Sequence, residues 1–198
     1  MSITLAKKQT VSLDKAAGNQ LSRISMGLGW DAVKGSGGFI AKFFGAGGGE
    51  IDLDASCILM DSDKNLLDTV WFQQLKSRDG SVRHSGDNRT GDGDGDDETI
   101  QVDLQRLPSA VKHLVFTVNS FTGQNFNEVE NAYCRIVDDV SGKELARYAL
   151  SEKGAHTGVI MAYLTRQEAG WSVTALGHVA RGRTVKDMAK EAINAIAA

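Results

Sequence analysis

An acidic, glycine-rich run is the segment of this sequence best suited to binding chemistry. Residues 86–98 hold six carboxylates and four glycines in thirteen positions, with Arg89 as the only basic residue among them. Carboxylate oxygens are the ligands that Ca²⁺ prefers, and glycines let a backbone curl so that several oxygens converge on one point. A solvated acidic turn is the alternative. Unpaired acidic runs usually lie in tails or linkers, whereas strand-like sequence flanks this one, so calcium is favoured.

The spacing within this run does not match an EF-hand. If Asp92 takes position one of the loop, Asp97 stands where the glycine belongs. If Asp87 takes position one, Arg89 falls on a ligand position. An EF-hand also needs flanking helices, whereas residues 99–104 alternate as a half-buried strand does. We therefore expect the run to join two strands.

Three more carboxylates stand outside the run. In the strand-like segment 51–61, the period of two places Asp52 and Asp54 on the same face, roughly 7 Å apart. Such a pair is stable only if a cation, or a neighbouring Lys or Arg, lies beside it. Asp31 is a third acidic group that the fold could bring near them. It follows a Gly-Leu-Gly-Trp segment, which is a poor dinucleotide motif because more glycines follow where a helix should begin.

No residue pattern indicates catalysis. The sequence lacks GxSxG, GxxxxGK and HExxH motifs, so no nucleophile, phosphate loop or zinc-protease site is predicted. Cys57 and Cys134 lie far apart without metal-ligand spacing, and we expect two buried thiols. The four histidines are equally scattered. We therefore expect a protein that is not an enzyme and has no histidine-based metal site.

Composition narrows the class of protein further. The 198 residues carry a net charge of −3, fit a single domain over 1–198, and contain no basic cluster interleaved with aromatic residues. Nucleic acid is therefore not expected as a partner. The N-terminus has no apolar signal region, and no stretch reaches the roughly 18–20 apolar residues that span a bilayer, so we expect a cytoplasmic location. The oligomeric state stays open.

Strand-like segments dominate the chain and predict a mainly β fold, an antiparallel two-sheet β-sandwich. The expected strands are 3–5, 9–13, 21–28, 51–60, 67–74, 100–104, 113–119, 132–138, 144–150, 158–166 and 171–178. A C-terminal α-helix is predicted after Thr184, since Asp187 completes a capping-box pattern and apolar residues recur every three or four positions as far as Ile196. We expect its apolar stripe to dock on the sandwich rather than on a partner. A short helical turn is predicted over 125–129.

Several motifs resemble one protein family along nearly the whole chain. They are Gly27-Leu28-Gly29-Trp30-Asp31, Asp52-Leu53-Asp54-Ala55-Ser56, Asp79-Gly80-Ser81, His84 to Gly91, Gly95-Asp96-Asp97-Glu98, Asn131-Ala132-Tyr133 and Glu144-Leu145-Ala146-Arg147-Tyr148. Together they are similar to the TerD family of tellurite-resistance and stress-response proteins.

This resemblance implies a β-sandwich with calcium-binding loops at one end, and we expect two Ca²⁺ ions. Carried over by motif, the metal ligands are Asp31, Asp52, Asp54, Asp87, Asn88, Asp96, Asp97 and Glu98. Asp92 and Asp94 would be outer ligands only. The resemblance also implies partners among other tellurite-resistance proteins, with the inner membrane face as a place where they could meet.

Two features resemble the TerZ branch of that family more than TerD itself. One is the longer Gly- and Phe-rich insertion 33–50, which could dock on a partner or fold back to cap the sandwich; the other is the C-terminal helix. The leading expectation is a non-enzymatic, calcium-responsive interaction module. A calcium-dependent membrane adaptor that inserts apolar residues of the insertion is the alternative. Detoxification of tellurite through Cys57 or Cys134 is a third, which would need an accessible thiolate.

Overall fold

The computed structural model describes residues 2–32, 52–86 and 95–196. Within them the elements follow the chain in this order: β1 (Ile3–Thr4), β2 (Thr10–Ser12), α1 (Leu13–Ala17), β3 (Arg23–Ala32), β4 (Leu53–Met60), β5 (Leu66–Val70), β6 (Val82–His84), β7 (Glu98–Asp103), β8 (His113–Ser120), β9 (Val129–Asp138), β10 (Lys143–Ala149), β11 (Gly158–Gln167), β12 (Gly170–Ala180) and α2 (Val185–Ala195).

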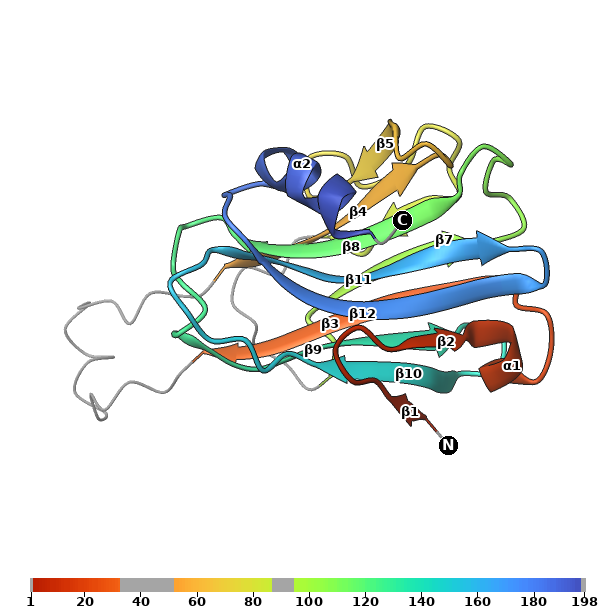
Figure 1. The fold of residues 1–198 in the computed structure, drawn as a ribbon, viewed down its shortest axis with the longest axis horizontal. Helices are drawn as coiled ribbons and strands as arrows, with labels where there is room; N and C mark the ends of the chain where they lie inside the picture. The colour runs from red at the N-terminus through yellow and green to blue at the C-terminus, as the bar shows by residue number, and fades with distance from the viewer. Residues whose placement is uncertain (1, 33–51, 87–94, 197–198) are drawn as a thin grey trace.

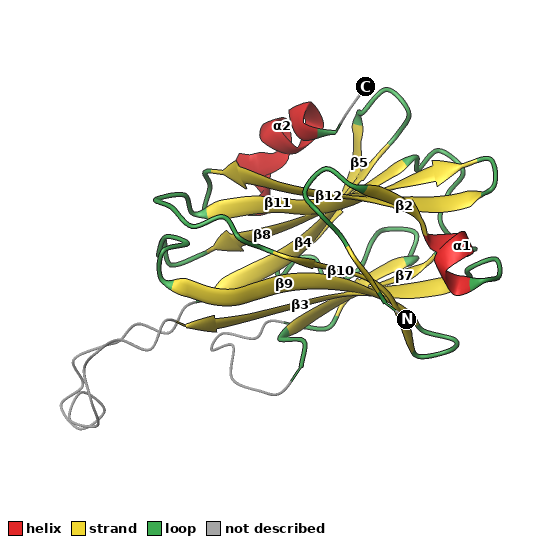
Figure 2. Cartoon of the chain, turned by 60° about the horizontal axis from the view of Figure 1, so that its bottom comes forward, coloured by secondary structure: helices red, strands yellow, loops and turns green. Residues whose placement is uncertain are grey.

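The strands form two six-stranded sheets stacked as the layers of a sandwich (Figures 1 and 2). Sheet A has the order β1-β10-β9-β3-β7-β6, and sheet B has the order β2-β12-β11-β8-β4-β5. Every pairing between these strands is antiparallel except that of β1 with β10. The predicted fold class, a mainly β two-sheet sandwich with a C-terminal helix, is confirmed.

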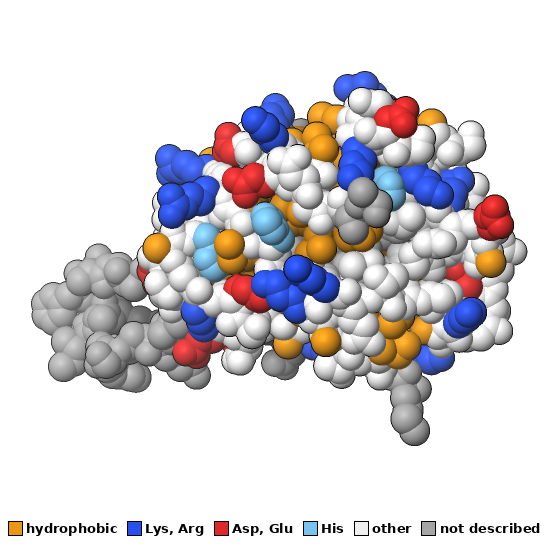
Figure 3. Space-filling model, in the orientation of Figure 1, with side chains coloured by type: hydrophobic (Ala, Val, Ile, Leu, Met, Phe, Trp, Pro, Cys, Tyr) orange, Lys and Arg blue, Asp and Glu red, His pale blue; other side chains and the backbone are white. Residues whose placement is uncertain are grey.

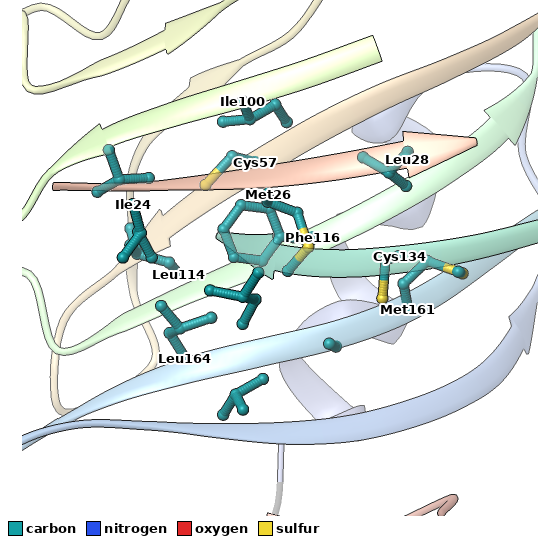
Figure 4. Packing of buried hydrophobic residues seen from close by; sticks show 14 of the residues in the cluster. Ile24, Met26, Leu28, Cys57, Ile100, Leu114, Phe116, Cys134, Met161 and Leu164 are labelled. Atoms are coloured by element: carbon teal, nitrogen blue, oxygen red, sulfur yellow. The ribbon is translucent and has the colours of Figure 1, made fainter. Parts of the chain in front are cut away.

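The main hydrophobic core lies between the two sheets. Strand β4 shows how the sequence builds it, because alternate residues Leu53, Ala55, Cys57 and Leu59 all belong to this core. Figure 4 shows the same packing around Phe116, with side chains reaching it from both sheets. The period of two thus fixes which residues of each strand face inward.

Helix α2 covers the outer face of sheet B (Figure 1). The carboxylate of Asp187 accepts the backbone N–H groups of Arg183 and Thr184, both at 3.0 Å, and so fixes the first turn. Val185, Met188 and Ala192 are buried in a second apolar cluster beneath the helix. The apolar stripe therefore docks on the parent sandwich, as predicted.

Some local features differ from the sequence prediction. The helical turn predicted over 125–129 does not form. The Asn125 side chain instead accepts a hydrogen bond from the N–H of Asn127 in a short turn, and strand β9 begins at Val129. Helix α1 and strand β6 were not predicted. The whole Gly/Phe-rich insertion 33–50 lies outside the described residues.

On the face of the molecule seen in Figure 3, basic and acidic side chains are interspersed. Among the described residues, no helix has the length and apolar character needed to cross a membrane.

Candidate metal centre

The predicted acidic residues gather at one end of the sandwich, which we call the acidic end and define by Asp31, Asp52, Asp54, Asp97 and Glu98. Strand β3 ends there, and β4 and β7 begin there (Figure 1). The antiparallel register places Leu28 of β3 opposite Glu98 of β7, so the end of one strand meets the start of the other. The strands thus bring together residues that are far apart in the sequence.

Glu98 ties the two sheets together inside the acidic end. Its side chain is fully buried, and Oε2 accepts the backbone N–H of Ala55 in the opposite sheet at 2.7 Å. The ring of His84 lies 3.2 Å from the same oxygen. His84 also accepts the Gly86 N–H on Nδ1 at 3.0 Å, so Nε2 is the nitrogen that carries the proton toward Glu98.

His84 was missed as a site residue by the sequence analysis. Burial disfavours its charged form, but the hydrogen bond and the charge of Glu98 outweigh burial and raise the pKa of His84. Asp54 acts in the same direction, so this carboxylate also belongs to the surroundings of the ring. Its place at the start of the His84 to Gly91 motif, beside the acidic run, was the sequence feature that could have indicated its role.

Asp97 is a half-buried carboxylate that is affected by other negative charges. Its Oδ2 atom accepts the backbone N–H of Trp30 at 2.8 Å, which fixes the carboxylate against the end of β3. Burial raises the pKa of Asp97, and the charges of Asp31, Asp96 and Glu98 raise it further against the opposing effect of the Trp30 hydrogen bond. A cation beside Asp97 would relieve this accumulation of charge.

Asp31 is exposed near the end of β3, and its charge contributes to the raised pKa of Asp97. Its Oδ2 atom accepts the side-chain N–H of Asn131 at 2.7 Å. Asn131 has a left-handed backbone conformation with φ of 52°, which asparagine tolerates better than most residues. The Asn131-Ala132-Tyr133 motif thereby places a side-chain amide at the acidic end.

Asp54 lies on the face of β4 opposite the inter-sheet core, as its period predicted. The carboxylate is buried and accepts the side-chain N–H of Asn119 at 3.2 Å, while the same amide nitrogen donates to the carbonyl of Arg183 at 2.7 Å. Asp52 is half-buried, and its backbone carbonyl accepts the N–H of Phe121 at 3.1 Å. Both aspartates are thus held at the end of β8, through Asn119 within the strand and Phe121 just after it.

Asp96 points to the outer face of sheet A and has a counter-ion of its own. Arg135 Nε donates to its Oδ1 at 2.8 Å, and the Tyr133 hydroxyl lies 3.1 Å from the same oxygen. The carboxylate packs directly on Gly27, where any Cβ would overlap it. Close side-chain approach, and not a nucleotide, therefore explains this glycine of the Gly-Leu-Gly segment.

The donor set has the chemistry of a calcium site, although the described residues alone do not complete one. The available groups are carboxylate and amide oxygens, which suit Ca²⁺. No cluster of three or more potential His, Cys, Asp or Glu ligands occurs within the described ranges. The predicted ligands Asp87 and Asn88 lie outside those ranges, so their positions stay a prediction.

Comparison with known proteins identifies the family. The TerD domain matches residues 1–191. The chain belongs to the TerD family. It is 55% identical over 194 residues to the tellurium resistance protein TerZ of Serratia marcescens, with 98% of each chain covered. The stress response protein SCP2 of Bacillus subtilis (strain 168) is 38% identical, with 95% of this chain and 98% of that relative covered.

A further relative supports the family assignment, and a solved structure supports the fold. The tellurium resistance protein TerD of Serratia marcescens is 36% identical, covering 98% of this chain and 100% of its own length. A crystal structure of a homologue of telluride resistance protein (TerD) from Streptomyces coelicolor A3(2) matches with a TM-score of 0.67 at 20% identity, over 85% of this chain and 95% of that one. The predicted TerD resemblance is therefore confirmed.

Proposed function

We propose that this TerD-family chain is a non-enzymatic calcium-binding protein of a tellurium-resistance and stress-response system. The observation that carries the proposal is the position of Asp97, a half-buried carboxylate that is fixed by the Trp30 N–H at the end of β3 and whose pKa is raised by burial and by neighbouring negative charges. Calcium would favour the charged form that burial and these neighbours disfavour. The names of its relatives, which refer to tellurium resistance and stress response, support the biological setting.

We propose different parts for the predicted ligands. Asp31 and Asp97 would hold one ion near the end of β3, and Asp52 and Asp54 would contribute to a second near the start of β4. Asp87 and Asn88 would supply further oxygens from the acidic run. Glu98 would position both groups, because it already bridges β7 to the backbone of β4. Asp96 stays in the predicted ligand set, but its pairing with Arg135 suits a supporting part.

Calcium binding would also make the chain an interaction module. Carboxylates that repel one another without metal become ordered when an ion joins them, so binding free energy becomes folding free energy at the acidic end. Surfaces formed from these segments would then depend on calcium. Other tellurite-resistance proteins are the partners we propose for such a surface.

Isothermal titration of the metal-free chain tests this proposal. Calcium is expected to bind with a stoichiometry of two ions per chain, and magnesium with far weaker heat, because Mg²⁺ needs near-octahedral geometry and gives up water reluctantly. The titration should be run at about 0.15 M salt so that loose attraction of counter-ions is screened. Absence of saturable calcium binding at millimolar concentration would contradict the proposal.

Both cysteines lie in the inter-sheet core (Figure 4), which argues against thiol chemistry as the function. Burial raises the pKa of Cys134 to about 12, against a small opposing effect of Arg147. Burial also raises the pKa of Cys57, and the charge of Asp68 adds to it. A reactive thiol needs an accessible thiolate, and neither side chain provides one.

We therefore expect the native protein to resist thiol reagents. Incubation with an aromatic disulfide reagent at neutral pH should release almost no chromophore over minutes, whereas the denatured chain should release that of two thiols. Stoichiometric labelling of the native chain within the mixing time would revive a thiol-based detoxification function.

A further inference from the structure

We propose that sheet A carries a second binding site, for a small phosphorylated ligand with hydroxyl groups, near the start of β3 and the end of β7. A groove of about 570 Å³ lies there, and the side chains of Arg23, Arg83 and Arg106 line it. We call it the arginine groove. Its volume falls within the usual range for small-molecule sites, about 300–1,000 Å³.

Strand pairing accounts for the convergence of the three arginines. Arg23 opens β3 and lies opposite Asp103, the last residue of β7. Arg83 of β6 lies opposite Gln101 of β7, and Arg106 follows in the turn after that strand. The sheet edge formed by β7 and β6 thus places three cations from separate segments around one hollow.

The two proposed sites share no residue, although Arg83 of the groove is followed in β6 by His84, which contacts Glu98 at the acidic end. Arg23 begins β3 and Asp31 is the residue before its last, so about eight strand rises of roughly 3.3 Å separate them, or about 26 Å. In Figure 1, β3 points toward the acidic end and β7 runs the opposite way, which places these ends on opposite sides of the molecule. Ligand binding in the arginine groove does not require the proposed calcium sites.

The guanidinium groups of the groove differ from those elsewhere on sheet A. Arg135 and Arg147 are ion-paired with carboxylates at 2.8 and 2.9 Å. Within the described part of the chain, no carboxylate oxygen forms an ion pair, at 4.0 Å or less, with a guanidinium nitrogen of Arg23, Arg83 or Arg106. Their planar donor groups are therefore available for phosphate, which guanidinium binds through two parallel hydrogen bonds.

Two carboxylates in the same lining narrow the class of ligand. Asp103 Oδ1 accepts the backbone N–H of Arg106 at 3.1 Å, and Asp139 Oδ1 accepts the hydroxyl of Ser25 at 2.6 Å. These bonds hold the two carboxylates to the sheet, where each can accept further hydrogen bonds from hydroxyl groups. A nucleic-acid backbone would be repelled by them. A sugar phosphate matches both halves of the groove, with its phosphate on the arginines and its hydroxyls on the aspartates.

Titration with ribose 5-phosphate in calcium-free buffer tests the proposal, followed by chemical shifts in a nitrogen-labelled sample. Ribose 5-phosphate should bind with a dissociation constant on the order of 1 mM or tighter. Arg83→Gln and Arg106→Gln should each weaken binding by about tenfold, because each removes a charge-assisted contact. Arg78→Gln is the matched control, since its side chain is exposed, lies outside the lining and carries the same charge. It should change affinity by less than about twofold.

Three comparisons would overturn the inference. Equal weakening by Arg78→Gln and Arg83→Gln would show general attraction of anions. If ribose bound as tightly as ribose 5-phosphate, the arginines would not contribute to recognition of the ligand. If inorganic phosphate bound as tightly, the aspartates would not contribute. Unchanged spectra outside the groove establish that each variant is folded, so loss of binding in a folded variant reports on the site itself.

Discussion

Calcium is expected to raise the melting temperature of this chain by about 10–20 °C relative to chelator. A ligand that binds only the native state at a hundredfold excess over its dissociation constant contributes roughly 2.7 kcal/mol per site. For a domain of this length, each kcal/mol shifts the melting temperature by about 2–4 °C. Two filled sites therefore give the expected shift, measured by circular dichroism or calorimetry.

Magnesium at the same concentration is the control in this experiment. It should produce a small shift or none, because a carboxylate-rich loop suits the larger and more flexible coordination of Ca²⁺. Equal melting temperatures in calcium and in chelator would contradict the account. Equal stabilisation by both metals would show general screening of acidic repulsion in place of a built site.

Asp97→Asn is expected to change stability in opposite directions with and without calcium. In chelator the variant should be more stable than wild type, on the order of 0.5 kcal/mol after allowance for solvent screening, because it removes a half-buried charge beside Asp31 and Glu98. In saturating calcium it should be less stable by about 2–3 kcal/mol, since one site is lost. Urea unfolding under both conditions measures the two differences.

The pH dependence in chelator gives an independent measure of the same group. The folded-state pKa of Asp97 is raised above its ordinary value of 3.8, so the folded state holds this proton more tightly than the unfolded state. The contribution of Asp97 to wild-type stability should be most favourable below pH 3.8 and decline as pH rises through its folded-state pKa. Asp97→Asn should lack this part of the decline.

Asp63→Asn is the matched control for Asp97→Asn. Asp63 lies in the exposed turn between β4 and β5, where its backbone N–H binds Asp61, and it carries the same charge. The substitution should leave stability within about 0.5 kcal/mol under both conditions. If both variants lose the same amount of calcium stabilisation, net charge and not a site is responsible.

The architecture was predictable because strand periodicity is a local property. Eleven expected segments correspond to strands of the structure, with shifted ends, since alternation already shows which residues face the core. Strand β6, which has three residues, was not among the expected segments. Helix α1 was missed although Ser12 caps it and Gly18 follows in a left-handed conformation, because five residues show no helical repeat.

The acidic end was predictable only in part, because its internal pairing depends on tertiary contacts. The sequence placed Asp54 on the face away from the core, and the structure agrees. It gave no indication that Arg135 would pair with Asp96, 39 residues away, or that His84 would contact Glu98. The sequence likewise gave no indication that Asn119 would contact the acidic end, since its hydrogen bond to Asp54 follows from the register of β8 on β4.

Diffraction from crystals grown in calcium tests the central claim most directly. An anomalous difference map collected at long wavelength locates calcium independently of the coordinates. The account predicts peaks about 2.3–2.6 Å from carboxylate oxygens of Asp31 and Asp97, and near Asp52 and Asp54. A map with no calcium peak at the acidic end, or with peaks only at surface turns such as that of Asp61, would contradict the account.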